Sequence, residues 1–166
     1  MAVYFTSDLH LSHQFMAKHR GFSTVQEHDD TIIENINSMV HKKDKLFILG
    51  DYAWNQYGML RGEEINCIHK ELVMGNHDTM VTKSYLRQFE RLTGFRDYKG
   101  FWLSHCPISS EDMRWRKGNL HGHRHGGFDD PPELYMPYFN VNIELHNMHP
   151  VKFDIIEEIF SGYSTD

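Results

Sequence analysis

The first half of the chain alternates strand-like and helix-like segments, and this alternation restricts the possible folds more than any other feature. Short runs rich in apolar and β-branched residues at 2–7, 45–49 and 71–74 are typical of buried strands. Between them, residues 24–41 carry apolar side chains at helical spacing, and residues 59–69 also fit a helix. Strands that alternate with helices form parallel βαβ units, so we expect an α/β fold with helices on the faces of a sheet.

The pattern changes in the second half, after a further helix expected at residues 80–92. Short strands follow one another there, and a short helix near 154–160 is expected to close the chain. This succession of short strands indicates a second sheet of antiparallel or mixed type. No repeat or flexible linker interrupts the chain, so we expect a single domain over residues 1–166. The strands are expected at about 95–98, 101–104, 118–121 and 138–145.

Composition and charge exclude several classes of protein. A hydrophobic fraction of 40% excludes intrinsic disorder, and a net charge of −6 argues against general binding to nucleic acid or anionic lipid. No run approaches the roughly 18 apolar residues of a transmembrane helix, and the N-terminus lacks the basic segment of a signal peptide. We therefore expect a cytoplasmic protein with no membrane association, in which Cys67 and Cys106 are reduced thiols. The sequence leaves its oligomeric state open.

Five of the expected strands run directly into side chains of the kinds that bind metal ions. Residues two apart in an extended chain point to the same side, so closely spaced pairs among them can hold a common ion. A glycine precedes three of these positions, which suits a crowded turn where a Cβ would clash. The side chains are those of Asp8, His10, Asp51, Asn76, His105, His123 and His125.

This donor set predicts which metals the chain can bind. Oxygen and nitrogen ligands without thiolate suit Fe, Mn, Zn, Ni or Co. Seven donors exceed the four that a tetrahedral zinc ion takes, and they suit two divalent ions that share one carboxylate. Two cations would also supply the local positive charge for binding phosphate that the net charge of −6 does not.

In sequence order, the motifs D-x-H, G-D, G-N-H-D, H and G-H-x-H resemble those of the calcineurin-like metallophosphoesterases. Any one motif occurs by chance as a helix cap, a turn or a hydrogen-bonded histidine, but that reading would require five independent coincidences. The resemblance implies an α/β, four-layer α/β/β/α sandwich of mixed sheets, with the metal site at the strand C-terminal ends and no large cap. It implies that one metal is bound by Asp8, His10 and His125 and the other by Asn76, His105 and His123, with Asp51 bridging the two.

The same resemblance implies the reaction. His77 would be a general acid or transition-state stabiliser, and Asp78 would orient it. We expect in-line attack by a metal-bridging hydroxide on a small phosphate ester, most simply a cyclic nucleotide or aryl phosphodiester. The alternatives are a phosphomonoesterase of the same family and a catalytically silent binding scaffold, although no ligand is missing as it would be in a scaffold.

Four nearby residues have two readings each. His13 either contacts substrate or begins a surface helix, and Arg124 either meets a phosphate or faces solvent. Trp54 and Tyr57 either stack on a base or aryl group or pack in the core or at the rim. Cys106 follows His105 directly, and alternation along a strand predicts that it points away from the metals into the core.

Overall fold

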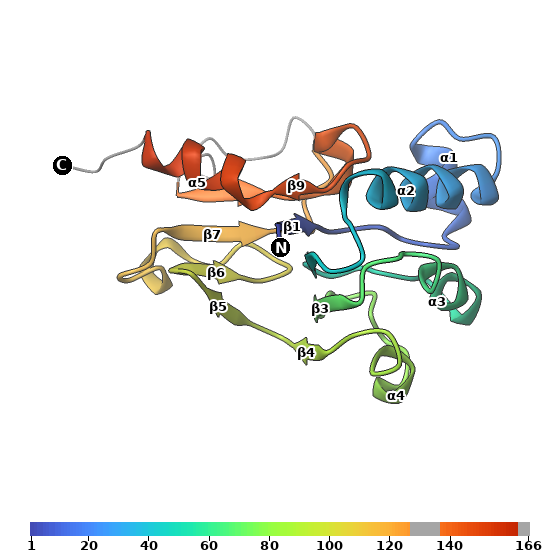
Figure 1. Cartoon of the computed structure of the whole chain (residues 1–166), viewed down its shortest axis with the longest axis horizontal. Coiled ribbons are helices and arrows are strands. Elements are labelled where there is room, and N and C mark those ends of the chain that lie inside the picture. Colours follow the sequence, from blue (N-terminus) through green and yellow to red (C-terminus); the bar gives the residue numbers. More distant parts are fainter. Residues whose placement is uncertain (127–136, 163–166) are drawn as a thin grey trace.

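The computed structural model describes residues 1–126 and 137–162, which form two mixed β-sheets flanked by helices (Figure 1). The first sheet has the strand order β4-β3-β2-β1-β9. Its first four strands are parallel, and the last is antiparallel to β1. These strands are β1 (Val3–Thr6), β2 (Lys45–Ile48), β3 (His69–Val73), β4 (Arg91–Thr93) and β9 (Val151–Lys152).

The second sheet has the order β5-β6-β7-β8. The β5–β6 pair is antiparallel and the other two pairs are parallel, as expected for a mixed sheet. The strands are β5 (Arg96–Tyr98), β6 (Phe101–Leu103), β7 (Gly118–His121) and β8 (Tyr138–Asn140).

Five α-helices are described, and none is long and apolar enough to cross a membrane. The longest, α2, begins where the Thr24 side chain accepts a hydrogen bond from the backbone N–H of Glu27. The helices are α1 (Gln14–His19), α2 (Val25–Met39), α3 (Gln56–Gly62), α4 (Thr82–Tyr85) and α5 (Phe153–Ser161), with 3₁₀ turns η1 (Ser110–Asp112) and η3 (Ile143–His146).

Two buried clusters hold these layers together. On one face of the first sheet, Ile36 of α2 packs in a cluster with Leu46 of β2. On the other face, Phe47 belongs to a second cluster with Phe101 of the second sheet and Phe153 of α5. Because adjacent strand residues point to opposite faces, Leu46 packs β2 against the layer on one face and Phe47 packs it against the layer on the other. The predicted fold class, an α/β sandwich of mixed sheets with flanking helices, is confirmed.

The structure corrects three of the predicted elements. The helix expected at 80–92 is only the short α4, because the chain then enters β4, which pairs with β3 and covers its edge. The helix expected at 59–69 is α3, which begins earlier because the Asn55 side chain accepts hydrogen bonds from Tyr57 and Gly58 N–H. The strand expected at 138–145 ends at Asn140, and η3 follows it.

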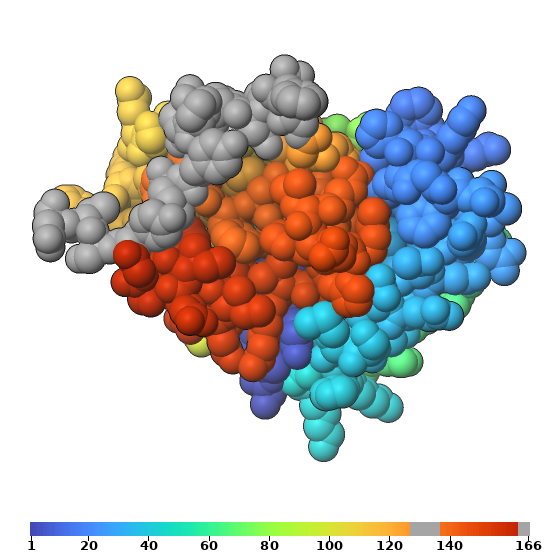
Figure 2. Space-filling model, turned by 90° about the horizontal axis from the view of Figure 1, so that it is seen from above, coloured from blue at the N-terminus to red at the C-terminus, as the bar shows by residue number. Residues whose placement is uncertain are grey.

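The segment that follows β8 lies against the N-terminal helices. Figure 2 shows the segment following β8, in orange, beside the blue surface of the first helices. The Asn35 side chain donates a hydrogen bond of 3.0 Å to the Met148 carbonyl oxygen. The fold thus brings residues more than one hundred positions apart to one place, which matters for the site below.

Candidate metal centre

The turns that follow β1 and β2 place the first candidate ligands in an unusual backbone conformation. Asp8, His10 and Asp51 have φ angles of 57°, 48° and 54°, and His123 has 69°. Residues other than glycine rarely adopt this left-handed region, and such strain collects at functional sites. Backbone hydrogen bonds of 2.9 Å from Asp8 N–H to Gly50 O and from His10 N–H to Asp51 O tie the two turns together.

The three glycines before candidate ligands are required by crowding, as the sequence predicts. A Cβ on Gly50 would lie 2.3 Å from Nδ1 of His105. A Cβ on Gly75 would lie 2.3 Å from Oδ1 of Asp51, and one on Gly122 would lie 2.5 Å from Oδ2 of Asp8. Each glycine thus makes room for a side chain supplied by a distant segment.

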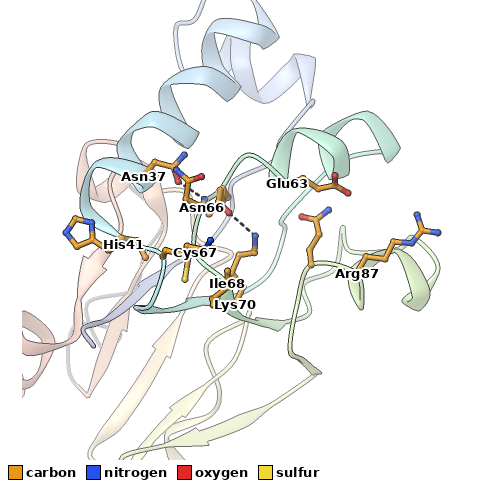
Figure 3. Close-up of a pocket in the computed structure, with 12 residues that line it drawn as sticks. Asn37, His41, Glu63, Asn66, Cys67, Ile68, Lys70 and Arg87 are labelled. Carbon is orange, nitrogen blue, oxygen red and sulfur yellow. Dashed lines mark hydrogen bonds between the residues drawn. The ribbon is translucent and has the colours of Figure 1, made fainter.

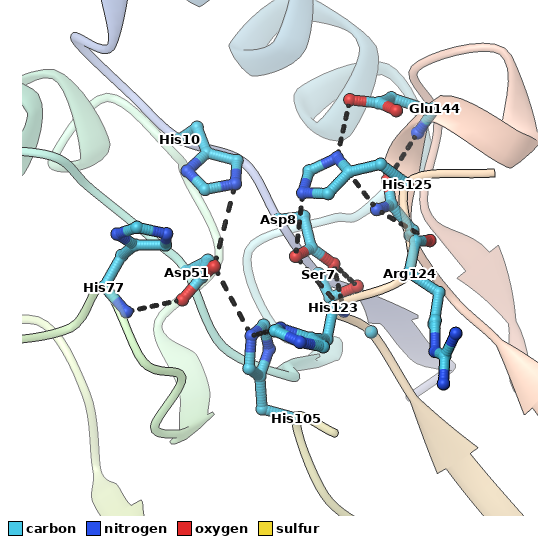
Figure 4. Close-up of polar contacts among 12 residues, drawn as sticks. Ser7, Asp8, His10, Asp51, His77, His105, His123, Arg124, His125 and Glu144 are labelled. Atoms are coloured by element: carbon cyan, nitrogen blue, oxygen red, sulfur yellow. Dashed lines mark hydrogen bonds and ion pairs between the residues drawn. The ribbon is translucent and has the colours of Figure 1, made fainter. Parts of the chain in front are cut away.

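Asp51 lies at the centre of the cluster (Figure 4). Its Oδ2 is 3.7 Å from Nε2 of His10 and 3.4 Å from Nε2 of His105. Its Oδ1 accepts a hydrogen bond of 2.9 Å from the backbone N–H of His77. One carboxylate oxygen of Asp51 therefore faces imidazoles from two different strand ends.

The remaining candidates join this centre from both sides. On one side, Oδ1 of Asp8 is 3.8 Å from Nε2 of His125. On the other side, Nε2 of His105 is 2.9 Å from Oδ1 of Asn76 and 3.1 Å from Nδ1 of His123. All seven candidate ligands are therefore brought together. Three groups could each hold a metal ion, with donor atoms within 4.8 Å of one another: Asp8, His10 and His125; Asp8, Asp51 and His105; and His105, Cys106 and His123.

Burial makes this donor set suited to cations. Nε2 of His10 is buried and has no hydrogen-bond partner among the described residues. Burial lowers the pKa of His10 to about 3, which leaves the imidazole neutral as a ligand must be, and burial raises the pKa of Asp8 to about 6. Burial would also raise the pKa of Asp51, but the neighbouring His105 and the His77 N–H lower it to about 2. Divalent cations would pair these buried oxygens and nitrogens, so the residues present fit the two ions expected.

The two candidate catalytic residues lie on the turn after β3. His77 is exposed, and its ring centroid is 5.6 Å from that of His10. Asp78 is buried, and its carboxylate accepts hydrogen bonds from the backbone N–H groups of Asp51, Tyr52 and Gly75 at 2.8–3.0 Å. Asp78 thus fixes the backbone that carries Asp51, and its effect on His77 stays a prediction.

The two candidate substrate-binding residues are placed differently. His13 is partly exposed beside the cluster, with its ring centroid 5.5 Å from that of His10. Its Nδ1 accepts a hydrogen bond from Met16 N–H, so it also caps α1. Arg124 extends its side chain away from the carboxylate of Asp8 (Figure 4), and its backbone carbonyl accepts from Asn140.

Sequence reasoning missed two residues that support the centre. The Glu144 Oε1 accepts hydrogen bonds from Nδ1 of His125 at 2.9 Å and from Nε of Arg20 at 2.6 Å. Arg20 also donates to the backbone carbonyls of Asp8 and Leu9, at 2.7 and 3.2 Å. The interactions with His125 and Arg20 lower the pKa of Glu144 to about 2, against the effect of burial.

Arg20 therefore does not face water as an arginine at a helix end usually does, since its side chain is 1% exposed. No motif marks either residue, because Arg20 and Glu144 are 124 positions apart. The only local signal is that Arg20 directly follows the last residue of a short helix.

Cys106 also corrects an expectation. It is exposed, and its Sγ lies within 4.8 Å of donor nitrogens of both His105 and His123. The strand β6 ends at Leu103, so the alternation that predicted a buried thiol does not reach this position. Cys106 thus borders the centre instead of packing in the core.

Known proteins resemble this chain over almost all of its length. The model of the calcineurin-like phosphoesterase family matches residues 1–159. An uncharacterized protein of Methanocaldococcus jannaschii is 32% identical over 165 residues, which cover 95% of this chain and 90% of that protein. The gene 66 protein of Mycobacterium phage L5 is 31% identical over 182 residues, with 86% of each chain covered.

A solved structure shows the same fold. The crystal structure of a protein of unknown function from Aquifex aeolicus superposes with a TM-score of 0.77 at 23% identity, covering 95% of this chain and 98% of that one. The chain belongs to the calcineurin-like phosphoesterase family, and this membership supports a metal-dependent phosphoester hydrolase with a dinuclear divalent metal centre.

Proposed function

We propose that this protein is a phosphodiesterase that hydrolyses cyclic nucleotide or aryl phosphodiesters at a centre of two divalent ions. The observation that carries the proposal is the position of Asp51, whose Oδ2 faces His10 on one side and His105 on the other. A carboxylate in that position is suited to bridge two cations.

The assignment of ligands follows the two sides of Asp51. Asp8, His10 and His125 would hold one ion, and Asn76, His105 and His123 the other. When bound, two such cations supply an ionised water nucleophile at neutral pH and neutralise charge on the phosphate oxygens. The ions could be Mn, Fe, Zn, Ni or Co, all of which accept oxygen and imidazole ligands.

The protein's own catalytic contribution comes from His77. Its residue is exposed beside the buried ligands, and its backbone N–H donates a hydrogen bond to the Asp51 carboxylate, which fixes the His77 backbone beside the centre. Its imidazole would donate a proton to the leaving oxygen, an effect typically worth about 10²–10⁴-fold in rate. Asp78 holds the turn on which His77 stands through the Gly75 N–H.

Two further side chains are proposed to contact substrate. His13 borders the cluster from the N-terminus of α1, within 5.5 Å of the His10 ring. Arg124 would act only with a substrate large enough to extend past His123, because its side chain points away from Asp8.

The proposed reaction is a direct in-line displacement at phosphorus without a phospho-enzyme. It predicts inversion at a chiral phosphorus, and retention would contradict it.

An open rim favours diesters over monoesters. Among the candidate residues, Asn76, His77 and His123 are exposed while Asp8, His10, Asp51 and His105 are buried at the base. A diester has a second substituent that needs such room. The main alternative is a phosphomonoesterase of the same family, and a silent binding scaffold is the other.

The test compares three substrates with the manganese-loaded protein. We expect faster turnover of bis-p-nitrophenyl phosphate and 2′,3′-cyclic nucleotides than of p-nitrophenyl phosphate. Much faster turnover of the monoester would favour the phosphatase. A protein that binds no metal and hydrolyses none of the three would favour the scaffold, and elemental analysis of the same sample distinguishes that result from failed loading.

A further inference from the structure

Trp54 lies at the rim of the candidate centre and is nearly half exposed. Its relative exposure is 47%, which is large for an indole. Its ring centroid is 5.4 Å from that of His77, the proposed proton donor, and 3.9 Å from that of His13 in an edge-to-face arrangement. An exposed aromatic surface therefore begins next to the group that would protonate the leaving oxygen.

The backbone that carries this indole is held in place on both sides. Trp54 N–H donates a hydrogen bond of 2.9 Å to the Leu11 carbonyl, and Ala53 forms a β-bridge with Leu11. The next residue, Asn55, caps α3. A rigid aromatic side chain loses little conformational entropy when a ligand binds to it, which favours recognition.

The neighbouring side chains extend the same aromatic surface. His13 is fixed because its Nδ1 accepts a hydrogen bond of 3.0 Å from Met16 N–H. Phe15 is 71% exposed, with its ring centroid 6.3 Å from that of His13. None of these three rings belongs to the two buried hydrophobic clusters. Core packing therefore does not account for Trp54.

We propose that Trp54, supported by His13, is the specificity-determining residue that stacks on a flat aromatic group of the phosphate ester. The inference rests on the proposed function, because the phosphate must bind at the metal centre for its substituent to reach this rim. It commits the substrate class to esters that carry a nucleobase or an aryl group, in preference to alkyl or simple sugar esters. Stacking of this kind is sequence-tolerant, so the discrimination is between aromatic and non-aromatic groups and not between bases.

The test measures binding of two phosphates that differ in the aromatic group. Manganese-loaded wild type, Trp54→Ala and Trp54→Phe are titrated calorimetrically with adenosine 5′-monophosphate and with ribose 5-phosphate. We expect Trp54→Ala to weaken nucleotide binding by about tenfold or more, within the range of one stacked base, and sugar phosphate binding by less than about twofold. Trp54→Phe should recover part of the nucleotide affinity. Trp115→Ala, which removes an indole 95% exposed on another loop, is the matched control and should change neither.

Three results would overturn the inference: equal losses for both ligands, no loss for the nucleotide, or no preference of the wild type for the nucleotide. Equal losses would mean that Trp54 only supports His13 and the turn. The proposed function fails separately, if the wild type hydrolyses no diester while its metal is bound. Binding and hydrolysis thus report on the two proposals independently.

Discussion

The two ends of the first sheet differ in how their polar side chains are satisfied. At the carboxyl ends of its strands, Asp8, His10 and Asp51 are buried on left-handed backbone, and a nitrogen of His10 has no hydrogen-bond partner among the described residues. At the amino end of β3 there is a cavity of about 600 Å³, whose lining includes Lys70 and Arg87 (Figure 3). None of the residues that line this cavity has a positive φ.

The comparison shows that the size of a cavity does not locate the chemistry. Arg87 and Glu63 at the cavity are exposed to water, and the buried Lys70 ammonium donates to the Ile65 carbonyl. Water and one carbonyl thus satisfy the charges there. At the other end, buried carboxylate oxygens and imidazole nitrogens converge without enough protons or positive charges to pair with them. A pair of bound cations would neutralise these buried groups.

The largest expected effect is loss of metal at the carboxyl end. Asp51→Ala should abolish diester hydrolysis and reduce bound metal, because it removes the carboxylate oxygen that lies 3.7 Å from Nε2 of His10 and 3.4 Å from Nε2 of His105. Elemental analysis measures the metal bound per chain, and hydrolysis of bis-p-nitrophenyl phosphate measures the activity. Glu71→Gln, which changes another buried carboxylate of the same sheet, is the control and should keep its metal. Full metal content in Asp51→Ala would contradict the bridging role.

The next effect separates proton donation from metal binding. His77→Ala should retain the metal content of the wild type and lower kcat by about 10²–10⁴-fold, since the ring donates a proton and is not a ligand. His69→Ala removes a histidine at the amino end of β3, where it pairs with Glu90, and should leave kcat unchanged. Metal loss in His77→Ala would place the ring among the ligands instead.

A smaller effect tests the supporting residues. Glu144→Ala should weaken metal binding by about 10–100-fold, because the carboxylate no longer orients His125. Glu144→Gln keeps an oxygen acceptor for the imidazole N–H and should recover part of the affinity. Titration of the metal-free variants with manganese measures this. Equal manganese affinity in wild type and Glu144→Ala would mean that Glu144 is not needed to orient His125.

The smallest effect concerns the cavity end and pH. Burial lowers the pKa of Lys70 from 10.5, so the unfolded chain binds more protons than the folded chain between the two pKa values. The free energy of unfolding of the wild type should therefore rise as the pH rises through that window, because the buried Lys70 loses its charge. Lys70→Met should be the more stable protein at pH 7, with the difference narrowing towards pH 10.5, and should hydrolyse diesters normally. Denaturant unfolding at both pH values measures the difference, and a widening gap would contradict the argument.

Much of the fold and of the candidate ligand set could be predicted because both depend on local pattern. Apolar runs such as Lys45–Ile48 mark strands by composition, and the polar side chains that follow them must surface at one edge of a parallel sheet. Element boundaries could not be predicted where tertiary pairing decides them. The pairing of Leu72 with Leu92 converts the end of an expected helix into β4.

The sequence by itself indicated the alternation of strands and helices in the first half of the chain, the seven candidate ligands and the need for glycine at Gly50, Gly75 and Gly122. Only the tertiary structure decided which distant groups support them. The Arg20–Glu144 pair and the contact of Trp54 with His77 join segments that no local pattern relates. The physical reason is that backbone conformation follows from neighbours along the chain, whereas burial and partnership depend on what the folded chain brings within a few ångströms.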